Sequence, residues 1–211
     1  VNIERHNAWL ACHALRPTRP MILAEHGGVQ DAHRPFAPIL QCKEAWCQGI
    51  ENSLRQDIWR FEVLKDDHVL EPGITLNWHV SAGDYGVTKV THSADNEGQL
   101  GAVSWDPPIT DIDRDFEKLH PRTFSVNRES TLAFKAALER AFDGLVPVEI
   151  RGSFFWTMGM TIVAIDLIGL ENLMLYMYDN PVGLHRIMAF LRDDHLAFID
   201  WLEKEELLSL N

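Results

Sequence analysis

The stretch LVPVEIRG, residues 145–152, decides the fold class because it is a short apolar strand between two helical segments. Before it, Asn127 can cap a helix that presents its apolar residues on one side and ends at Asp143-Gly144. After it, residues 156–178 have the pattern of a buried helix pair. A strand enclosed by helices is typical of a parallel sheet with helical crossovers.

The rest of the chain repeats this alternation of helices and strands. Helices are predicted at residues 2–15, 41–65, 127–142, 156–178 and 181–204, and strands at 21–25, 68–80, 145–152 and 207–210. Residues 81–126 are rich in Gly, Pro, Asp and Ser, which predicts a long loop excursion within one domain. Long ordered loops are often functional.

The alternation indicates an α/β fold, either a (βα)8 TIM-type barrel or a doubly wound sheet. No GxGxxG or GxxxxGK[ST] motif follows a predicted strand, so the strongest signals for a dinucleotide-binding fold or a P-loop are missing. A complete barrel needs about 250 residues, whereas this chain offers three strands and the start of a fourth. We therefore expect residues 1–211 to form about the first half of a (βα)8 barrel. Its open strand edge should associate with a second copy or with a separate second half.

Composition narrows the partners and the compartment. The net charge of −12 argues against nucleic acid or an anionic membrane as a partner. The longest apolar run, FFWTMGMTIVAI, has twelve residues, fewer than the about 20 that span a membrane. Three cysteines without CxxC spacing suit reduced thiols, so we expect a cytoplasmic protein.

Three stretches resemble the uroporphyrinogen decarboxylase-like superfamily. They are LQCKEAWCQGIENSLRQDIWRF (40–61), SWDPPITDIDRDFEKLHPRTF (104–124) and IGLENLMLYMYDNPVGLHRIMAFLRDDH (168–195). The resemblance runs over nearly the whole chain and implies a (βα)8 barrel longer than this one. The superfamily contains porphyrinogen decarboxylases, which use no cofactor. It also contains cobalamin-dependent methyltransferases, which move a methyl group between a corrinoid and a thiol, often with zinc.

Two departures from the decarboxylase pattern favour the methyltransferase branch. Decarboxylases carry an RQAGRY-type motif after the first strand, where this chain reads AEHGGVQ with Glu25 and His26. Thr161 stands where those enzymes carry a tyrosine. The resemblance therefore implies methyl transfer by the full-length form, with a corrinoid carrier protein or a small molecule as partner.

Two alternatives stay open. The chain is either a decarboxylase of uroporphyrinogen or a related tetrapyrrole acid, or a non-catalytic half-barrel that pairs with another chain. No cofactor is assigned to these residues. Zinc and a corrinoid are expected only in the full-length protein, because the family's zinc ligands lie mostly in the second half of the barrel.

Active sites of (βα)8 barrels lie at the carboxyl ends of the strands, and this rule nominates the candidate residues. The expected acid/base residues are Glu25, His26 and Glu71. Because neighbouring strand ends lie side by side, we expect these three to converge on one pocket. The same rule nominates Arg151, Phe155 and Trp156 as substrate-binding residues. Asn77 and His79 join them because they alternate with apolar residues, as on a strand with one polar face.

Three residues of types that often bind metals are expected to have structural roles instead. Cys42 and Cys47 lie five residues apart in the predicted helix at 41–65, so about 140° of rotation separates them. We expect buried, inert thiols that share no ligand. His195 lies on the apolar stripe of the last helix, where a core histidine paired with a carboxylate is expected. No metal site is predicted within the chain.

Overall fold

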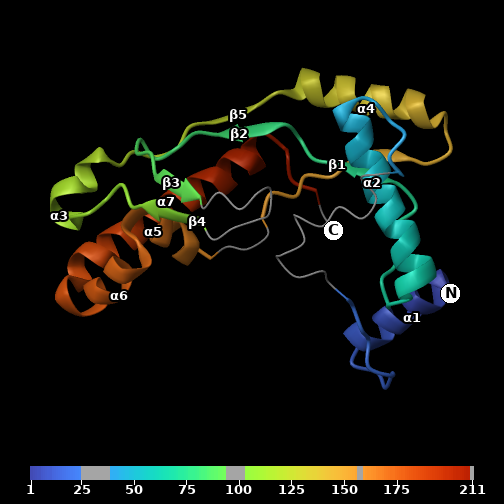
Figure 1. The fold of residues 1–211 in the computed structure, drawn as a ribbon, viewed down its shortest axis with the longest axis horizontal. Helices are drawn as coiled ribbons and strands as arrows, with labels where there is room; N and C mark the ends of the chain where they lie inside the picture. Colours follow the sequence, from blue (N-terminus) through green and yellow to red (C-terminus); the bar gives the residue numbers. More distant parts are fainter. Residues whose placement is uncertain (25–38, 94–102, 156–158, 210–211) are drawn as a thin grey trace. The chain divides into compact units, whose positions relative to one another are not determined.

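The computed structural model describes residues 1–24, 39–93, 103–155 and 159–209, which form two compact units (Figure 1). The N-terminal unit is Val1–Pro72, and the C-terminal unit holds the described residues from Gly73 onward. The N-terminal unit contains the helices α1 (Asn2–His13) and α2 (Ala45–Trp59), the latter continued by a π-helical turn, η3 (Arg60–Leu64). The predicted helices at 2–15 and 41–65 are thus confirmed, although α2 begins four residues later than expected.

The strand predicted at 21–25 is wrong for its described residues, since 21–24 form no strand. Two buried aspartates hold this segment instead. The Asp67 carboxylate accepts the N–H of Ile22 at 2.7 Å, and the Asp66 carboxylate accepts the N–H of Ala24 at 3.1 Å. Backbone donors that a sheet would use are thereby satisfied by side chains. Arg19 pairs with Asp67 and lowers the pKa of that carboxyl group well below its ordinary range.

Glu51 fastens the segment before α2 onto the helix. Its carboxylate accepts the N–H groups of Gln41 and Cys42 at 2.8 and 2.9 Å, and pairs with Arg55 one turn further along. The hydrogen bond from the Cys42 backbone and the bond from Arg55 lower the pKa of Glu51 from 4.5 to about 2. We call these contacts the Glu51 clamp.

The Glu51 clamp predicts acid sensitivity of the N-terminal unit. A carboxyl group whose pKa is lower in the folded state stabilises that state above its unfolded pKa and loses the contribution as it becomes protonated. The stabilisation from Glu51 should be complete above pH 4.5 and disappear as the pH falls to about 2. A carbon-13 NMR titration of the Glu51 carboxyl group should give a midpoint near pH 2. Glu51→Gln should remove this part of the pH dependence of unfolding, and a midpoint near pH 4.5 would refute the clamp.

The C-terminal unit contains most of the secondary structure. Its helices and helical turns are α3 (Ile112–Asp115), η4 (Phe116–Lys118), α4 (Arg128–Phe142), α5 (Thr161–Ile168), α6 (Leu170–Asp179) and α7 (Pro181–Lys204). Its strands are β1 (Ile74–Leu76), β2 (Val80–Ala82), β3 (Val90–Ser93), β4 (Val103–Asp106), β5 (Phe124–Val126) and β6 (Val148–Ile150). They form three two-stranded sheets in the order β1-β6, β2-β5 and β3-β4.

The pair β1-β6 is parallel, with Leu76 opposite Ile150. Along the chain, the connection from β1 to β6 runs through the excursion from β2 to β5 and then through α4. The β1-β6 pair confirms the expected parallel pairing of the predicted strands within 68–80 and 145–152, whereas the half-barrel as a whole stays a prediction. The local signals also hold. Asn127 accepts the Ser130 N–H at 2.9 Å to cap α4, and Asp143 ends that helix in the left-handed conformation.

The excursion at 81–126 is more ordered than the sequence suggests. The antiparallel pair β2-β5 closes its base, with Ala82 opposite Phe124, and the two strands run side by side in Figure 1. A second antiparallel pair, β3-β4, lies within it. Ile109 and Ile112 from the excursion are fully buried against α5, α6 and α7. The excursion therefore supplies part of the core of this unit.

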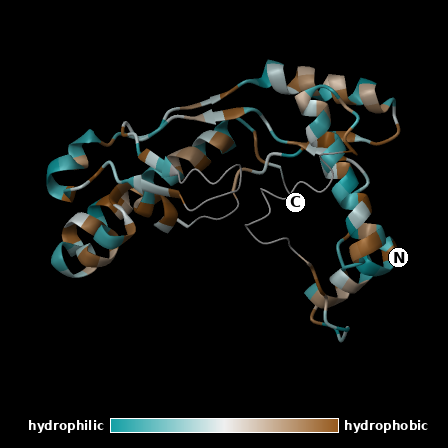
Figure 2. Cartoon of the chain, in the orientation of Figure 1, coloured by the Kyte–Doolittle hydropathy of each residue, from teal (hydrophilic) through white to brown (hydrophobic). Residues whose placement is uncertain are grey.

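The helices α5 and α6 are bent by 96° at Gly169, which adopts φ +81°, a conformation that glycine tolerates best. The bend lets both helices contact α7. Hydrophilic and hydrophobic residues both lie along α6 in Figure 2. Within the described residues no single helix is long and apolar enough to cross a membrane, although this bent pair passes that test by length and composition.

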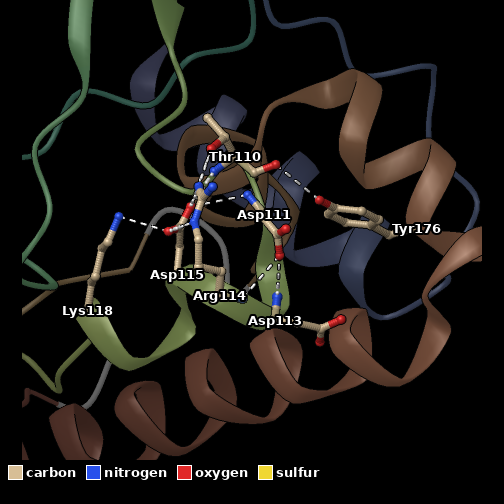
Figure 3. Close-up of polar contacts among 7 residues, drawn as sticks. All are labelled: Thr110, Asp111, Asp113, Arg114, Asp115, Lys118 and Tyr176. Atoms are coloured by element: carbon tan, nitrogen blue, oxygen red, sulfur yellow. Dashed lines mark hydrogen bonds and ion pairs between the residues drawn. The ribbon is translucent and has the colours of Figure 1, made fainter.

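A buried carboxylate organises the short helix α3 (Figure 3). The Asp115 side chain is 1% exposed and ion-paired with Arg114 and Lys118, at 2.6 and 2.8 Å. It also accepts the backbone N–H groups of Thr110 and Asp111. The side-chain bonds from Arg114 and Lys118 hold the pKa of Asp115 well below its ordinary range. These contacts satisfy a buried charge and give it a structural role.

Candidate functional site

The carboxyl ends of β1 and β6 bring two predicted substrate-binding residues to one edge. The Arg151 N–H donates to the Leu76 carbonyl at 2.8 Å, so the pairing continues past both strands. Asn77 follows β1 directly, and Ser153 lies three residues after β6. In a parallel pair both carboxyl ends open toward the same edge, which is where barrel enzymes carry their sites.

The Asn77 side chain joins the two strand extensions. Its Oδ1 accepts the N–H groups of Ser153 and Trp78 at 3.2 and 3.0 Å, and its Nδ2 donates to the Ser153 carbonyl. The amide thus substitutes for a peptide group between the extensions. Among the described residues its second N–H has no hydrogen-bond partner, and the residue is exposed, so one donor remains available.

Gly152 lies between these residues and packs against the end of the chain. The Ser209 N–H donates to the Gly152 carbonyl at 3.2 Å, and the Gly152 N–H donates to the Ser209 hydroxyl at 3.0 Å. Leu207 is buried beside them. The strand predicted at 207–210 is not formed by its described residues, but this segment does lie against the extension of β6. Asn77, Arg151, Gly152, Ser153 and Ser209 together form what we call the strand-end cluster.

Arg151 gives the strand-end cluster its positive charge. Its guanidinium lies 3.4 Å from the Glu149 carboxylate, and the two side chains are 53% and 57% exposed. An ion pair in this setting contributes about 0–1 kcal/mol, so an anionic or polar ligand can displace Glu149 at little cost.

His79 lies on the connection between β1 and β2, where it contacts the first turn of α4. Its N–H donates to the Thr131 hydroxyl at 3.0 Å, and its Nδ1 lies 2.9 Å from the Ser130 Oγ. Its ring centroid lies 6.1 Å from that of Phe134. The exposed imidazole is therefore positioned by α4, on the connection between β1 and β2.

Phe155 lies in a hydrophobic cluster. Its ring centroid is 5.7 Å from that of Phe198, and Phe154 contacts the same ring at 6.4 Å. Leu202 and Leu207 complete the buried part of this cluster. The structure thus gives Phe155 a packing role beneath the strand-end cluster.

The predicted acid/base residues are not brought together by what the structure describes. Glu25, His26 and Trp156 lie outside the described residues. Glu71 is an exposed residue of the N-terminal unit, next to Pro72. The convergence of Glu25, His26 and Glu71 on one pocket stays a prediction.

Sequence reasoning missed Arg128, the first residue of α4. Its guanidinium lies 5.9 Å from the Trp78 ring centroid and 2.9 Å from the Glu205 carboxylate. Arg128 and Glu205 are 77 positions apart in the chain. No local pattern reports such a pairing. One sequence signal did suggest that Arg128 has a tertiary partner, because the helix macrodipole disfavours a basic residue in the first turn of a helix.

Neither a grouped set of metal ligands nor a similar protein indicates what the strand-end cluster binds, so its function is inferred from its own residues. Within the described ranges no three His, Cys, Asp or Glu side chains are grouped to hold a metal ion. Comparison with family models, curated proteins and solved structures found no match to this chain. The strand-end cluster offers hydrogen-bond donors and one cation, and no described group in it is a nucleophile activated by a base.

The N-terminal unit has a pocket of about 660 Å3. Ligand pockets commonly lie between about 300 and 1,000 Å3. Its lining residues are Val1, Glu4, Arg5, Ala8, Arg19, Phe61, Glu62, Lys65 and Asp67. Arg5 lies 4.7 Å from the Phe61 ring centroid, and Arg19 is paired with Asp67. These cations are thus already engaged, so the pocket displays no concentrated charge of one sign.

Proposed function

We propose that this chain supplies the first βα units of a (βα)8 barrel of the uroporphyrinogen decarboxylase-like type. In its full-length form, such a barrel would transfer a methyl group from a corrinoid to a thiol acceptor. The observation that supports the proposal is the parallel pair β1-β6, which α4 precedes directly at β6 and whose carboxyl edge carries the strand-end cluster. A second observation supports it as well. The guanidinium of Arg151 is paired with Glu149, so this edge carries little net charge.

That charge pattern suits a ligand rich in amide and other neutral polar groups. Asn77 would donate its second N–H to such a group, and Arg151 would bind an acceptor on the ligand after releasing Glu149. An octa-carboxylate needs several cations, whereas this edge offers one. When bound, a corrinoid supplies the transferable methyl group. No described residue group fits zinc, so thiol activation is assigned to none of these residues.

The proposal predicts saturable binding of methylcobalamin by the chain, measured as quenching of tryptophan fluorescence. Arg151→Gln should weaken this binding about tenfold, which corresponds to the loss of one charge-assisted hydrogen bond. Arg192→Gln is the matched control, because Arg192 is a similarly exposed arginine paired with the adjacent Asp193 on α7. It should leave the affinity unchanged.

Three results would contradict the proposal in different ways. Equal affinities of the two variants would remove the strand-end cluster from the site. Turnover of uroporphyrinogen at enzymatic rates would favour the decarboxylase alternative. Binding of neither ligand, together with stable association into a larger assembly, would favour the non-catalytic half-barrel.

A further inference from the structure

The structure overturns the separation expected between Cys42 and Cys47. Because α2 begins at Ala45, Cys42 precedes the helix, and the rotation of about 140° does not apply. The Glu51 carboxylate holds the Cys42 N–H at 2.9 Å, and the Gln48 side-chain amide donates to the Cys42 carbonyl at 2.9 Å. Cys42 is thus folded back onto the first turns of α2.

This fold-back places Cys42 beside Cys47. Cys47 and Glu51 are four residues apart in α2 and so lie on the same face of the helix. The backbone of Cys42 is fixed between Gln48 and Glu51 on that face. Burial raises the pKa of the Cys42 thiol, and its contacts with Glu51 and with the Cys47 side chain raise it further. Neither cysteine is fully buried, so a small reagent can reach the pair.

We propose that Cys42 and Cys47 form a dithiol that a low-molecular-weight disulfide oxidises reversibly to an intramolecular disulfide. The thiolate of Cys47 attacks one sulfur of the reagent, the reagent's S–S bond breaks, and one thiolate leaves. Cys42 then gives its proton to solvent and attacks the Cys47 sulfur, which expels the second reagent thiolate. The protein loses two electrons and two protons, and the reagent disulfide becomes two thiols.

The two cysteines differ in their parts in this exchange. Burial and the neighbouring Glu51 carboxylate raise the pKa of the Cys42 thiol, so we assign the first attack to Cys47. Glu51 is a positioning residue, because it holds the Cys42 backbone and touches no reagent. Cys12, which is a free cysteine in α1, provides an internal comparison.

The test uses the full chain in buffers with set ratios of reduced to oxidised glutathione. The reaction is quenched with acid, free thiols are alkylated, and peptides are mapped by mass spectrometry. At about 0.1 mM glutathione, we expect the Cys42–Cys47 linkage to exceed glutathione adducts at these residues about tenfold, because a neighbouring thiol has an effective concentration of about 1 mM. Cys12 should remain alkylated or carry glutathione.

Three variants separate the steps, and a fourth, Cys12→Ser, is the control. Cys42→Ser should leave glutathione on Cys47, and Cys47→Ser should leave it on Cys42, because each variant lacks the second thiol that would displace the adduct. Glu51→Gln should lower the linked fraction while α2 keeps its helicity by circular dichroism. Cys12→Ser should change nothing. Glutathione adducts without the Cys42–Cys47 linkage, or linkages to Cys12 at equal yield, would overturn the proposal.

Discussion

Gly152→Ala is expected to lower the free energy of unfolding of the C-terminal unit by about 3 kcal/mol, the upper part of the range for overpacking. An alanine Cβ there would lie 1.5 Å from the Leu207 carbonyl oxygen and 3.2 Å from the Leu208 Cα. Both obstacles are backbone atoms, so no side-chain rotation relieves the clash. The chain end would have to move away, breaking both hydrogen bonds between Gly152 and Ser209.

Two other glycines isolate the effect of the clash. At Gly49 in α2 an added Cβ meets nothing within 4 Å, and alanine favours a helix, so Gly49→Ala should be neutral or stabilising. Gly144 also has open space but adopts φ +76°, so Gly144→Ala should cost only about 1 kcal/mol. Urea unfolding and hydrogen exchange of the Arg151 amide measure all three. If Gly152→Ala is no worse than Gly144→Ala, the close approach is not real.

Asp194→Ala is expected to destabilise the same unit by about 3 to 5 kcal/mol, the cost of leaving a buried charge without its partner. The Asp194 side chain is 1% exposed and lies 2.7 Å from the Arg122 guanidinium. It also accepts the backbone N–H of Arg122 at 2.9 Å and the Tyr85 hydroxyl at 3.2 Å. The orphaned guanidinium would remain among aromatic rings, 5.1 Å from the centroid of Tyr85 and 5.6 Å from that of Phe198.

Asp193, the residue before Asp194, serves as the control for the loss of an exposed aspartate. Asp193 pairs with Arg192 on the exposed side of α7, where both side chains are more than half exposed. Asp193→Ala should therefore change the free energy of unfolding by about 0.5 kcal/mol or less. Thermal and urea unfolding of the two alanine variants should differ clearly. Equal stabilities would mean that Asp194 is not a buried anchor.

The helices and their ends could be predicted because their signals are local. Asn127 and Asn180 cap α4 and α7 as their positions before helical stripes indicate. The buried face of α7 is also predictable from its apolar stripe, but the buried polar residue on that face is Asp194 rather than His195. His195 bonds to the Leu191 carbonyl at 2.8 Å rather than to a carboxylate. Asp194, seven residues after Ile187, occupies the buried stripe, and its partner lies 72 positions away in the sequence.

The candidate site was predicted only in outline. The strand-end rule nominates Arg151, whereas Asn77 is nominated by its alternation with Leu76, and the parallel pairing of β1 and β6 places both residues at one edge. Neither pattern could show that the Asn77 amide is used to bind Ser153, which depends on tertiary contact. The cysteine pair was missed for a different reason. Starting the helix at 41 instead of Ala45 placed Cys42 on the helix and turned its thiol away from Cys47.

The closed base of the excursion bears on how this chain can tolerate insertions and deletions during evolution. Because β2 and β5 are paired, the segment between them begins and ends at the same place, so its length can change without altering β1, α4 or β6. Changes are therefore tolerated around the β3-β4 hairpin. They are not tolerated around Ile109 and Ile112, which are buried against the helices. Related chains should differ in length mainly between β2 and Ile109. The number of residues from Ile109 to β5 should stay constant.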